Sequence, residues 1–314
     1  MADLKSQLIN NRVVPDSNLA QTIINFVYTS WDYQGQYFPG PQPISIERKH
    51  FSILSQGNHL VCEKSDGVRH LFVAMMYQDK KVAFFINRSF EIIYIRVVFA
   101  KHVYQGTILD GELMENSYLI YDAIRVSDTD VMKRNFIERL TFAETVTKGI
   151  LKVANQISFT VKTFFYMNDS TFWDSYLPNL NYKTDGIVCT PIYDTITTGT
   201  HENMFKWKPC EKNTIDFMAK KALIGHGSPK WNLYVQEKGK LIFESEIPMS
   251  LAPEWITEDC IVECQYMSNE HPRWWKPLQL RVDKTHPNNR RTFYNTLTNI
   301  KENIKIGELR VVYL

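Results

Sequence analysis

Short apolar runs of five to eight residues, separated by turns, follow one another through residues 60–124. Runs of this length between polar turn residues are typical of buried β-strands, because helices need longer segments with a 3.6-residue period. Two pairs of runs are close enough in sequence to form hairpins, namely 82–86 with 90–95 and 107–113 with 118–124. This part of the chain is therefore predicted to fold as antiparallel sheet.

Helices and further strands are predicted on either side of this region. Asp16 and Ser17 can cap a helix whose apolar residues recur at helical spacing, namely Leu19, Ile23, Phe26 and Val27. Three prolines between residues 39 and 43 favour an extended segment ahead of residues 44–46. Residues 127–154 read as a second helix, and strand patterns return at 157–166, 186–190 and 204–207.

The pattern changes after Pro209, where five short strands are predicted at 215–222, 231–236, 240–245, 260–267 and 277–282. A turn at 236–239 makes a hairpin of the second and third, and five such strands are what an OB-fold barrel requires. Residues 287–314 have helical patterning. We therefore predict an α+β chain with a first domain of antiparallel sheets and helices over 1–210 and an OB-fold β-barrel domain over 211–302. A C-terminal helix at about 303–314 is expected to pack back on the first domain.

Composition excludes little beyond a membrane span. The chain has 314 residues, 44% of them hydrophobic, and no apolar run of eighteen or more. Its N-terminus lacks the layout of a signal peptide, and its five cysteines have no metal-like spacing, so reduced thiols in an intracellular compartment are expected. The net charge of +2 neither requires nor excludes a nucleic acid.

A lysine between two apolar runs is the strongest chemical signal. Lys64 opens the pattern Lys-x-Asp-Gly-x-Arg, which ends at Arg69 and is predicted to form a tight turn. Four fixed identities would occur by chance in a chain of this length in roughly a few sequences per thousand. A lysine there costs desolvation energy unless it has a task, and an unprotonated amine could attack a phosphorus atom. We interpret Lys64 as a nucleophile.

Two further Asp-Gly pairs adjoin apolar runs. Asp110-Gly111-Glu112 follows one run, and Asp185-Gly186 precedes another. Each pair alone would be read as a hairpin turn. Together with Lys64 they indicate one pocket, in which Glu112 would hold ribose hydroxyls and Asp185 would bind a divalent ion or orient the lysine.

Two groups of cations complete the pattern. Lys206 and Lys208 are two residues apart, so that on a strand both face one side and suit an α-phosphate. Arg281, Asp283 and Lys284 form a strand of mixed charge whose cations could hold the β- and γ-phosphates of a nucleoside triphosphate.

In this order these segments, with residues 118–122 between the second and third, resemble motifs I, III, IIIa, IV, V and VI of the mRNA capping guanylyltransferases. The resemblance covers about residues 39–309 and is strongest to the compact stand-alone enzymes of large DNA viruses, of the chlorella-virus type. It implies a nucleotidyltransferase domain, similar to ATP-grasp and DNA-ligase folds, followed by the OB-fold domain.

The resemblance also implies roles for individual residues. Lys64 would be the guanylylated lysine, Arg69 and Glu112 would contact ribose, and Arg88 would bind phosphate. Tyr121 would stack on guanine and Lys162 would contact its edge, while Lys206 and Lys208 would hold the α-phosphate. Asp216 would be an essential carboxylate. The residues that would act from the mobile barrel are Arg281, Asp283 and Lys284. Asp185 and Asp216 are the candidate metal ligands.

The activity implied is a two-step transfer that uses Mg²⁺ or Mn²⁺. Lys64 would take GMP from GTP and release pyrophosphate, and the 5′-diphosphate end of an RNA would then receive the GMP. A separate RNA triphosphatase and a cap methyltransferase are expected as partners, in the host nucleus or cytoplasm if the chain is viral. No membrane partner is expected.

Two other interpretations remain open from the sequence. An ATP-dependent polynucleotide ligase uses the same lysine chemistry, although Asp185 stands where ligases usually carry glutamate. A non-catalytic nucleic-acid-binding subunit could have kept the fold.

Overall fold

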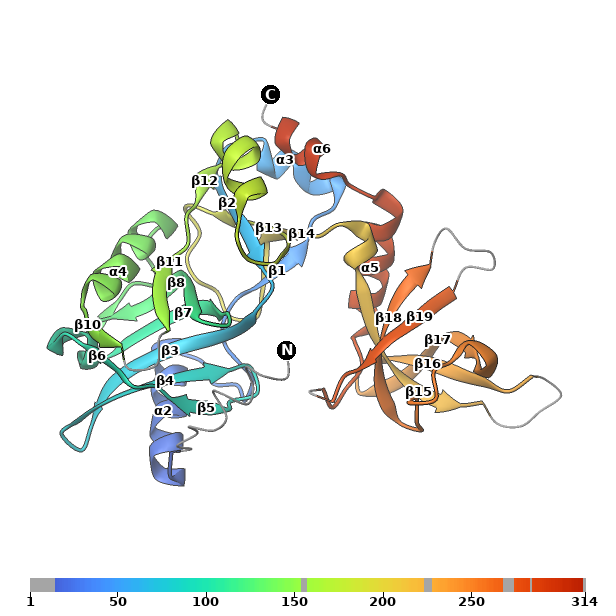
Figure 1. Ribbon diagram of the computed structural model, residues 1–314, viewed down its shortest axis with the longest axis horizontal. Helices are drawn as coiled ribbons and strands as arrows, with labels where there is room; N and C mark the ends of the chain where they lie inside the picture. The colour runs from blue at the N-terminus through green and yellow to red at the C-terminus, as the bar shows by residue number, and fades with distance from the viewer. Residues whose placement is uncertain (1–14, 154–156, 223–227, 268–273, 283, 313–314) are drawn as a thin grey trace. The chain divides into compact units, whose positions relative to one another are not determined.

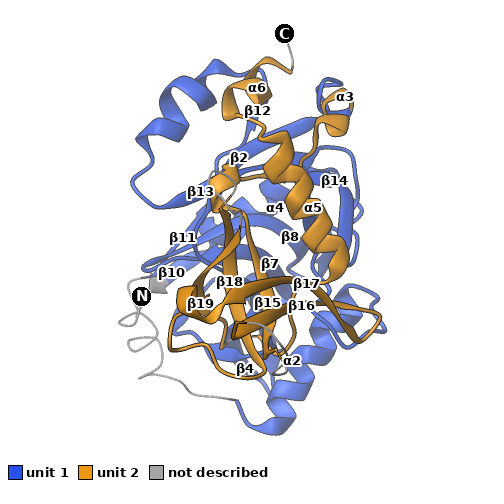
Figure 2. Cartoon of the chain, turned by 90° about the vertical axis from the view of Figure 1, so that its right-hand side faces the viewer, with its two compact units in different colours: residues 1–44, 53–206, 313–314 blue, residues 45–52, 207–312 orange. Residues whose placement is uncertain are grey.

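The computed structural model describes residues 15–153, 157–222, 228–267, 274–282 and 284–312 (Figure 1). The chain divides into two compact units, which Figure 2 colours separately. Of the described residues, the first unit takes 15–44 and those within 53–206, and the second takes 45–52 and those within 207–312. The domain limits at 210 and 302 and the docking of the last helix stay predictions.

The larger sheet of the first unit carries both expected hairpins. Its strand order is β11-β8-β7-β3-β4-β5, with β9 (Thr129–Asp130) added beside β8. The strands are β3 (Val68–Tyr77), β4 (Lys80–Asn87), β5 (Ile92–Tyr94), β7 (Thr107–Leu113), β8 (Ser117–Val126) and β11 (Ser158–Val161). The β4–β5 and β7–β8 pairings are antiparallel, as predicted.

One pairing departs from the antiparallel prediction. Strand β11 runs parallel to β8. A parallel neighbour needs a long crossover, and here the chain between them contains the helix α4 (Phe136–Lys148). The prediction of antiparallel sheets is therefore wrong for this edge of the sheet.

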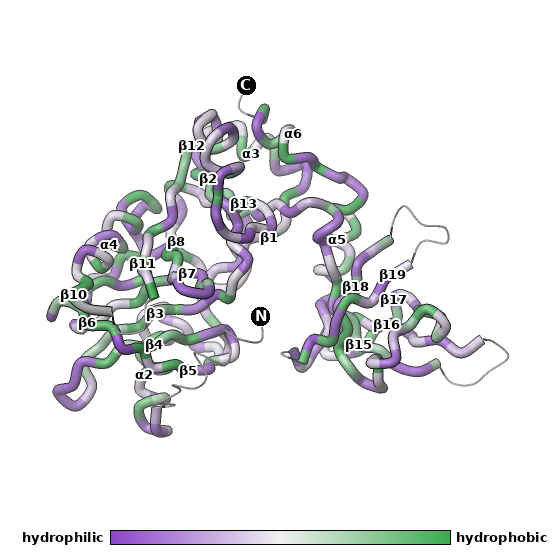
Figure 3. The backbone as a smooth tube through the Cα atoms, viewed as in Figure 1, coloured by the Kyte–Doolittle hydropathy of each residue, from purple (hydrophilic) through white to green (hydrophobic). Residues whose placement is uncertain are grey.

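Many residues along the strands of this sheet are hydrophobic (Figure 3). Because successive strand residues point to opposite sides, their apolar side chains form a core on each face. On one face Phe72 and Phe85 pack with Ala143 and Val146 of α4. On the other face the neighbouring residues pack against α2 (Ser17–Ser30), drawn in dark blue in Figure 1. The predicted cap is confirmed, since Asp16 accepts a hydrogen bond from the Leu19 amide at 2.9 Å.

A second sheet of the first unit has the order β1-β14-β13-β2-β12. Its strands are β1 (Gln42–Ser45), β2 (His59–Ser65), β12 (Phe165–Tyr166), β13 (Thr184–Pro191) and β14 (Thr200–Trp207). Strand β2 continues into β3 of the larger sheet through Asp66 and Gly67. The lysine motif therefore links the two sheets.

The helix predicted over 127–154 is much shorter. Asn135 caps α4 and accepts from the Glu138 amide at 3.0 Å, while Glu138 accepts from the Asn135 amide in return. Gly149 ends the helix, and β10 (Ile150–Val153) pairs with β6 (Val97–Phe99). The predicted strand 157–166 is divided into β11 and β12. The helical turns at Phe172–Tyr176 and Leu177–Asn179 were not predicted.

The second unit contains the five strands expected after Pro209. They form an antiparallel sheet of order β17-β16-β15-β18-β19, with bounds β15 (Thr214–Lys221), β16 (Lys230–Glu237), β17 (Lys240–Pro248), β18 (Cys260–Met267) and β19 (Trp274–Leu280). Phe217, Trp275 and Phe293 meet in its core. The sheet order leaves β17 and β19 at its edges, so the closed barrel of an OB-fold stays a prediction.

Short helical segments complete the fold. The C-terminal helices are α5 (Arg290–Glu302) and α6 (Ile306–Val311), in the region where the tail was predicted to be helical. The remaining segments are Arg48–His50, α3 (Phe51–Leu54), Lys101–Gln105, Cys210–Lys212 and Met249–Leu251. Among the described residues, we find no helix with the length and apolar character that a membrane crossing requires.

Candidate active site

Lys64 lies at the end of strand β2 rather than in a turn. The turn prediction is wrong by one or two residues, because β13 pairs with β2 as far as Lys64 and Ser65 and satisfies their backbone groups. The amine of Lys64 is 2.9 Å from Asp185 Oδ1, and the two side chains are 26% and 14% exposed. The proposed nucleophile is thus partly shielded and still accessible.

A β-bulge positions Asp185. The register passes from Thr184 opposite Ser65 to Gly186 opposite Lys64, which leaves Asp185 as the extra residue of β13. Bulges redirect a side chain and are common beside active sites. In this arrangement Asp185 lies next to Lys64, as its proposed role in orienting the lysine requires.

Two of the glycines permit close approach between strands. A Cβ atom on Gly67 would lie 2.7 Å from the Leu113 carbonyl oxygen, and one on Gly111 would lie 2.7 Å from that of Leu119. Backbone atoms cannot yield at such distances, so any larger residue would push the strands apart. The motif glycines therefore serve packing around the lysine.

A buried carboxylate, that of Asp110, holds Arg69 in place. Asp110, 1% exposed, accepts from Arg69 Nε at 2.9 Å and from Nη2 at 2.5 Å. The hydroxyl of Tyr121 donates to the same Asp110 Oδ1 at 2.9 Å, and the Pro41 carbonyl accepts from Arg69 Nη1 at 2.7 Å. Asp110 thus fixes both the candidate ribose ligand and the candidate base-stacking ring.

Glu112 and Arg88 lie in the same electrostatic environment. Glu112 faces Arg69 across the β3–β7 ladder. Burial raises the pKa of Glu112, while the charges of Lys64, Lys162, Arg69 and Arg88 oppose that shift. The pKa of Arg88, in the turn after β4, is lowered first by desolvation and then by the charge of Arg69.

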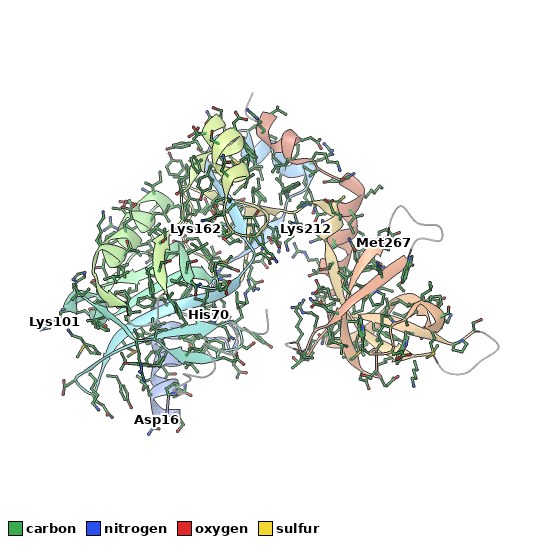
Figure 4. All side chains as sticks on the ribbon, in the orientation of Figure 1. Asp16, His70, Lys101, Lys162, Lys212 and Met267 are labelled. Atoms are coloured by element: carbon green, nitrogen blue, oxygen red, sulfur yellow. The ribbon has the colours of Figure 1, made fainter. Side chains whose placement is uncertain are left out.

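Lys162 is buried directly after β11, where Figure 4 labels it. Its amine forms an ion pair with Glu63 Oε1 at 2.8 Å and donates to Ser65 Oγ at 2.9 Å. It also donates to the Glu63 carbonyl oxygen at 2.5 Å. Lys162 is therefore not a solvent-exposed lysine of a strand. It contacts both residues that flank Lys64 in sequence, Glu63 and Ser65.

Lys206 lies on β14, which ends at Trp207, so Lys208 lies one residue beyond the strand and the shared side of the two lysines stays a prediction. Burial alternates from Phe205 to Lys208, with Phe205 and Trp207 buried and both lysines half-buried. Lys206 belongs to the first unit, and Lys208 follows Trp207 in the second. The Trp207 indole donates to the Ile304 carbonyl oxygen at 2.8 Å, which fixes this residue within the second unit.

The remaining candidates gather in the second unit. Arg281 Nη1 lies 3.0 Å from Asp216 Oδ1 and 3.6 Å from Glu263 Oε2, and Lys284 forms an ion pair with Asp216. The strand prediction is wrong for Arg281 and Lys284, since β19 ends at Leu280 and the Lys284 amide donates to the Arg281 carbonyl in a turn. Asp283 lies outside the described residues.

The described side chains could bind a divalent ion only together with phosphate oxygens of the substrate. Among the described residues, no three histidine, cysteine, aspartate or glutamate side chains are grouped to hold a metal. Mg²⁺ commonly takes one or two carboxylates together with substrate phosphates, and Asp185 beside Lys64 offers one such carboxylate. Asp216 fits less well, because two cations already neutralise it.

Glu63 was not predicted as part of the site, and Asp110 was placed in the predicted pocket without a role of its own. Both are buried carboxylates within apolar strands, and a buried charge requires a partner. That requirement was a usable signal, since Asp110 belongs to a recognised motif and Glu63 directly precedes Lys64.

Comparisons with known proteins cover nearly the whole chain. The family model of the mRNA capping enzyme catalytic domain matches residues 9–210, and that of the mRNA capping enzyme C-terminal domain matches residues 212–310.

Individual relatives agree with the family models. An mRNA-capping enzyme subunit alpha from Schizosaccharomyces pombe is 26% identical over 87% of this chain and 79% of its own length. mRNA-capping enzymes from Caenorhabditis elegans and Danio rerio are 27% and 28% identical over 84% and 83% of this chain. The chain matches only 47% and 46% of the lengths of these last two.

Among solved structures, a mycobacterial DNA ligase D complexed with ATP and MES aligns with 78% of this chain and 96% of its own. Its identity of 12% and TM-score of 0.44 are too low to support an argument. The two family models, which together span residues 9–310 apart from residue 211, are decisive. The chain belongs to the mRNA capping enzyme family.

Proposed function

We propose that this chain is the guanylyltransferase of mRNA capping. The observation that carries the proposal is the pairing of Lys64 with Asp185 at 2.9 Å, within a chain that both capping-enzyme family models match. Arg69, Glu112 and Tyr121 lie on neighbouring strands of the same unit, and Lys162 directly follows another. These are the groups that a nucleotide's ribose and base require.

In the first step the neutral amine of Lys64 attacks the α-phosphorus of GTP. A P–N bond forms, the bond between the α-phosphorus and the bridging oxygen breaks, and pyrophosphate leaves. The proton leaves the amine for Asp185 or solvent. In the second step a terminal oxygen of a 5′-diphosphate RNA attacks the same phosphorus and the P–N bond breaks. Lys64 leaves as the amine and takes up a proton from solvent or Asp185, and the product is GpppRNA.

The other residues bind and orient. Arg69 and Glu112 hold the ribose, Tyr121 stacks on the base, and Lys162 contacts its edge. The phosphates are held by cations, which are Arg88, Lys206, Lys208, Arg281 and Lys284, with Asp216 and Asp283 as supporting carboxylates. A bound Mg²⁺ or Mn²⁺, held by Asp185 and substrate phosphates, would neutralise charge that develops on the phosphate oxygens.

An RNA triphosphatase and a cap methyltransferase would supply the reactions before and after this one. The viral subgroup and the cellular compartment stay predictions. The family models disfavour the ligase alternative. A ligase of this kind would use ATP, whereas the proposed enzyme uses GTP.

The test is covalent self-labelling. The chain incubated with α-labelled GTP and Mg²⁺ should give a labelled band that survives denaturant and alkali and is released by acid, as a phosphoramidate is. Lys64→Ala should abolish the band, whereas Lys148→Ala, on the exposed face of α4, should not change it. Labelling from ATP in place of GTP would point to a ligase, and an adduct on another side chain would overturn the assignment of Lys64.

A further inference from the structure

Glu63 is a buried charge that the proposed reaction does not use. Its exposure is 0%, and it immediately precedes Lys64 on β2. A carboxylate is expensive to bury unless it is paired and hydrogen-bonded. The groups around Glu63 therefore indicate what it does.

Among the described residues, four side chains bind the Glu63 carboxylate, one of which is that of Ser65, whose hydroxyl donates to Oε1 at 3.5 Å. Lys162 Nζ lies 2.8 Å from Oε1, the Tyr182 hydroxyl donates to Oε1 at 2.8 Å, and the Tyr176 hydroxyl donates to Oε2 at 3.2 Å. The carboxylate raises the pKa of Tyr182, after desolvation as the larger cause, so this phenol stays a donor at neutral pH. We call Glu63, Tyr176 and Tyr182 the carboxylate cluster.

The carboxylate cluster takes two of the three N–H groups of Lys162. One points to the Glu63 carboxylate and one to the Glu63 carbonyl oxygen at 2.5 Å. The third donates to Ser65 Oγ at 2.9 Å. If the third N–H donated to a ligand instead of to the Ser65 hydroxyl, the Glu63 carboxylate would still be paired with Lys162. The third N–H is therefore the one that can bind a ligand.

The amine lies close to the proposed nucleotide site. Ser65 follows Lys64 in the chain, and Lys162 is among the cations that act on the pKa of Glu112, together with Lys64 and Arg69. Lys162 therefore belongs to the same group of interacting charges as Glu112, the candidate ribose ligand, and Lys64.

Lys162 also keeps its proton in this setting. Burial by itself lowers the pKa of a lysine, but neighbouring charges outweigh it and the pKa of Lys162 is raised. The Cys62 thiol is neutral at pH 7, since burial raises its pKa to about 12. The neighbouring charges that keep Lys162 protonated are therefore that of Glu63, which is the larger cause, and that of Glu112.

We propose that the carboxylate cluster positions Lys162 as a fixed, donor-only reader of the purine 6-position, which selects a 6-oxopurine over adenine. Guanine presents acceptors at O6 and N7, whereas adenine presents a donor at N6, which a protonated lysine cannot pair with. Glu63 acts through Lys162 and is a positioning residue. The inference rests on the proposed function and adds to it the residues that set base selectivity.

The experiment compares self-labelling rates with GTP, ITP and ATP. ITP keeps the 6-oxo group and lacks the 2-amino group, so it isolates the 6-position. Glu63→Gln should lower the GTP-to-ATP and ITP-to-ATP rate ratios at least tenfold, and Tyr182→Phe should lower both to a smaller extent. Tyr166→Phe, which removes an exposed hydroxyl from β12, is the matched control and should leave both ratios unchanged.

A purely structural role would lower the yield or stability of the variants and leave the ratios unchanged in the folded fraction. If folded Glu63→Gln keeps the wild-type ratios, the inference is wrong. If Glu63→Gln does not fold, the double variant Glu63→Leu, Lys162→Met carries the test, because removing both partners of a buried pair is often tolerated. That variant should label without preference, and retained preference would refute the cluster's role.

The two proposals fail in different ways. Wild-type chain that forms no lysine adduct with GTP would refute the proposed function. If the wild-type chain labels with a strong preference for 6-oxopurines and the variants keep that preference, only the role of Glu63 is refuted.

Discussion

At the scale of single residues, Asp110 is the group whose loss should cost most. It is buried, and among the residues that the structure describes it alone accepts from both Arg69 and Tyr121. Asp110→Asn leaves the Arg69 charge buried without its counter-ion, which should lower the free energy of unfolding by about 3 kcal/mol. Equilibrium urea unfolding measures this. Asp128→Asn is the control, because its pair with Arg125 is exposed at the carboxylate and should change the value by less than about 0.5 kcal/mol. Similar losses in both variants would contradict the role given to Asp110.

At the scale of secondary structure, the bulge in β13 should determine labelling. Gly186 has φ +152° beside the bulged Asp185, a conformation that residues with a Cβ rarely adopt. Gly186→Ala should lower the free energy of unfolding by about 1–3 kcal/mol and slow self-labelling, because Asp185 moves away from Lys64. Gly307→Ala, within α6 where a Cβ meets nothing within 4 Å, should instead be neutral or stabilising by up to about 1 kcal/mol. Unchanged labelling in a folded Gly186→Ala variant would show that the bulge geometry is dispensable.

At the scale of the whole molecule, buried histidines should make stability depend on pH. Desolvation, as the largest cause, lowers the pKa of His59, His70 and His201 below the ordinary 6.5. Below pH 6.5 the unfolded chain then binds more protons than the native one, so each histidine reduces stability on acidification, by at most about 1.4 kcal/mol per pH unit. His70→Gln should therefore show a shallower fall in unfolding free energy between pH 7 and 5 than the wild type. His102→Gln, at an exposed site, should keep the wild-type slope. Equal slopes in both variants would contradict the prediction.

Local pattern was enough for most of the elements. Short apolar runs between turns predicted the hairpins β4–β5, β7–β8 and β16–β17, and the Asp16 cap marked the start of α2. The prediction of a helix over 127–154 is wrong at its C-terminal end because apolar spacing continues beyond Gly149, where α4 ends and the chain turns into β10. The parallel edge at β11 follows from a crossover, which no local pattern reveals.

Covalent order alone supplies Lys64, the Asp-Gly pairs and the paired lysines, and these motifs predict the family that both family models match. Which of these groups contact one another depends on how the chain folds. Glu63 and Lys162 are 99 residues apart, and Arg69 and Asp110 are 41 apart. Such contacts depend on strand register, a bulge and the desolvation of charges that must find partners once buried, and none of these is set by neighbours in sequence.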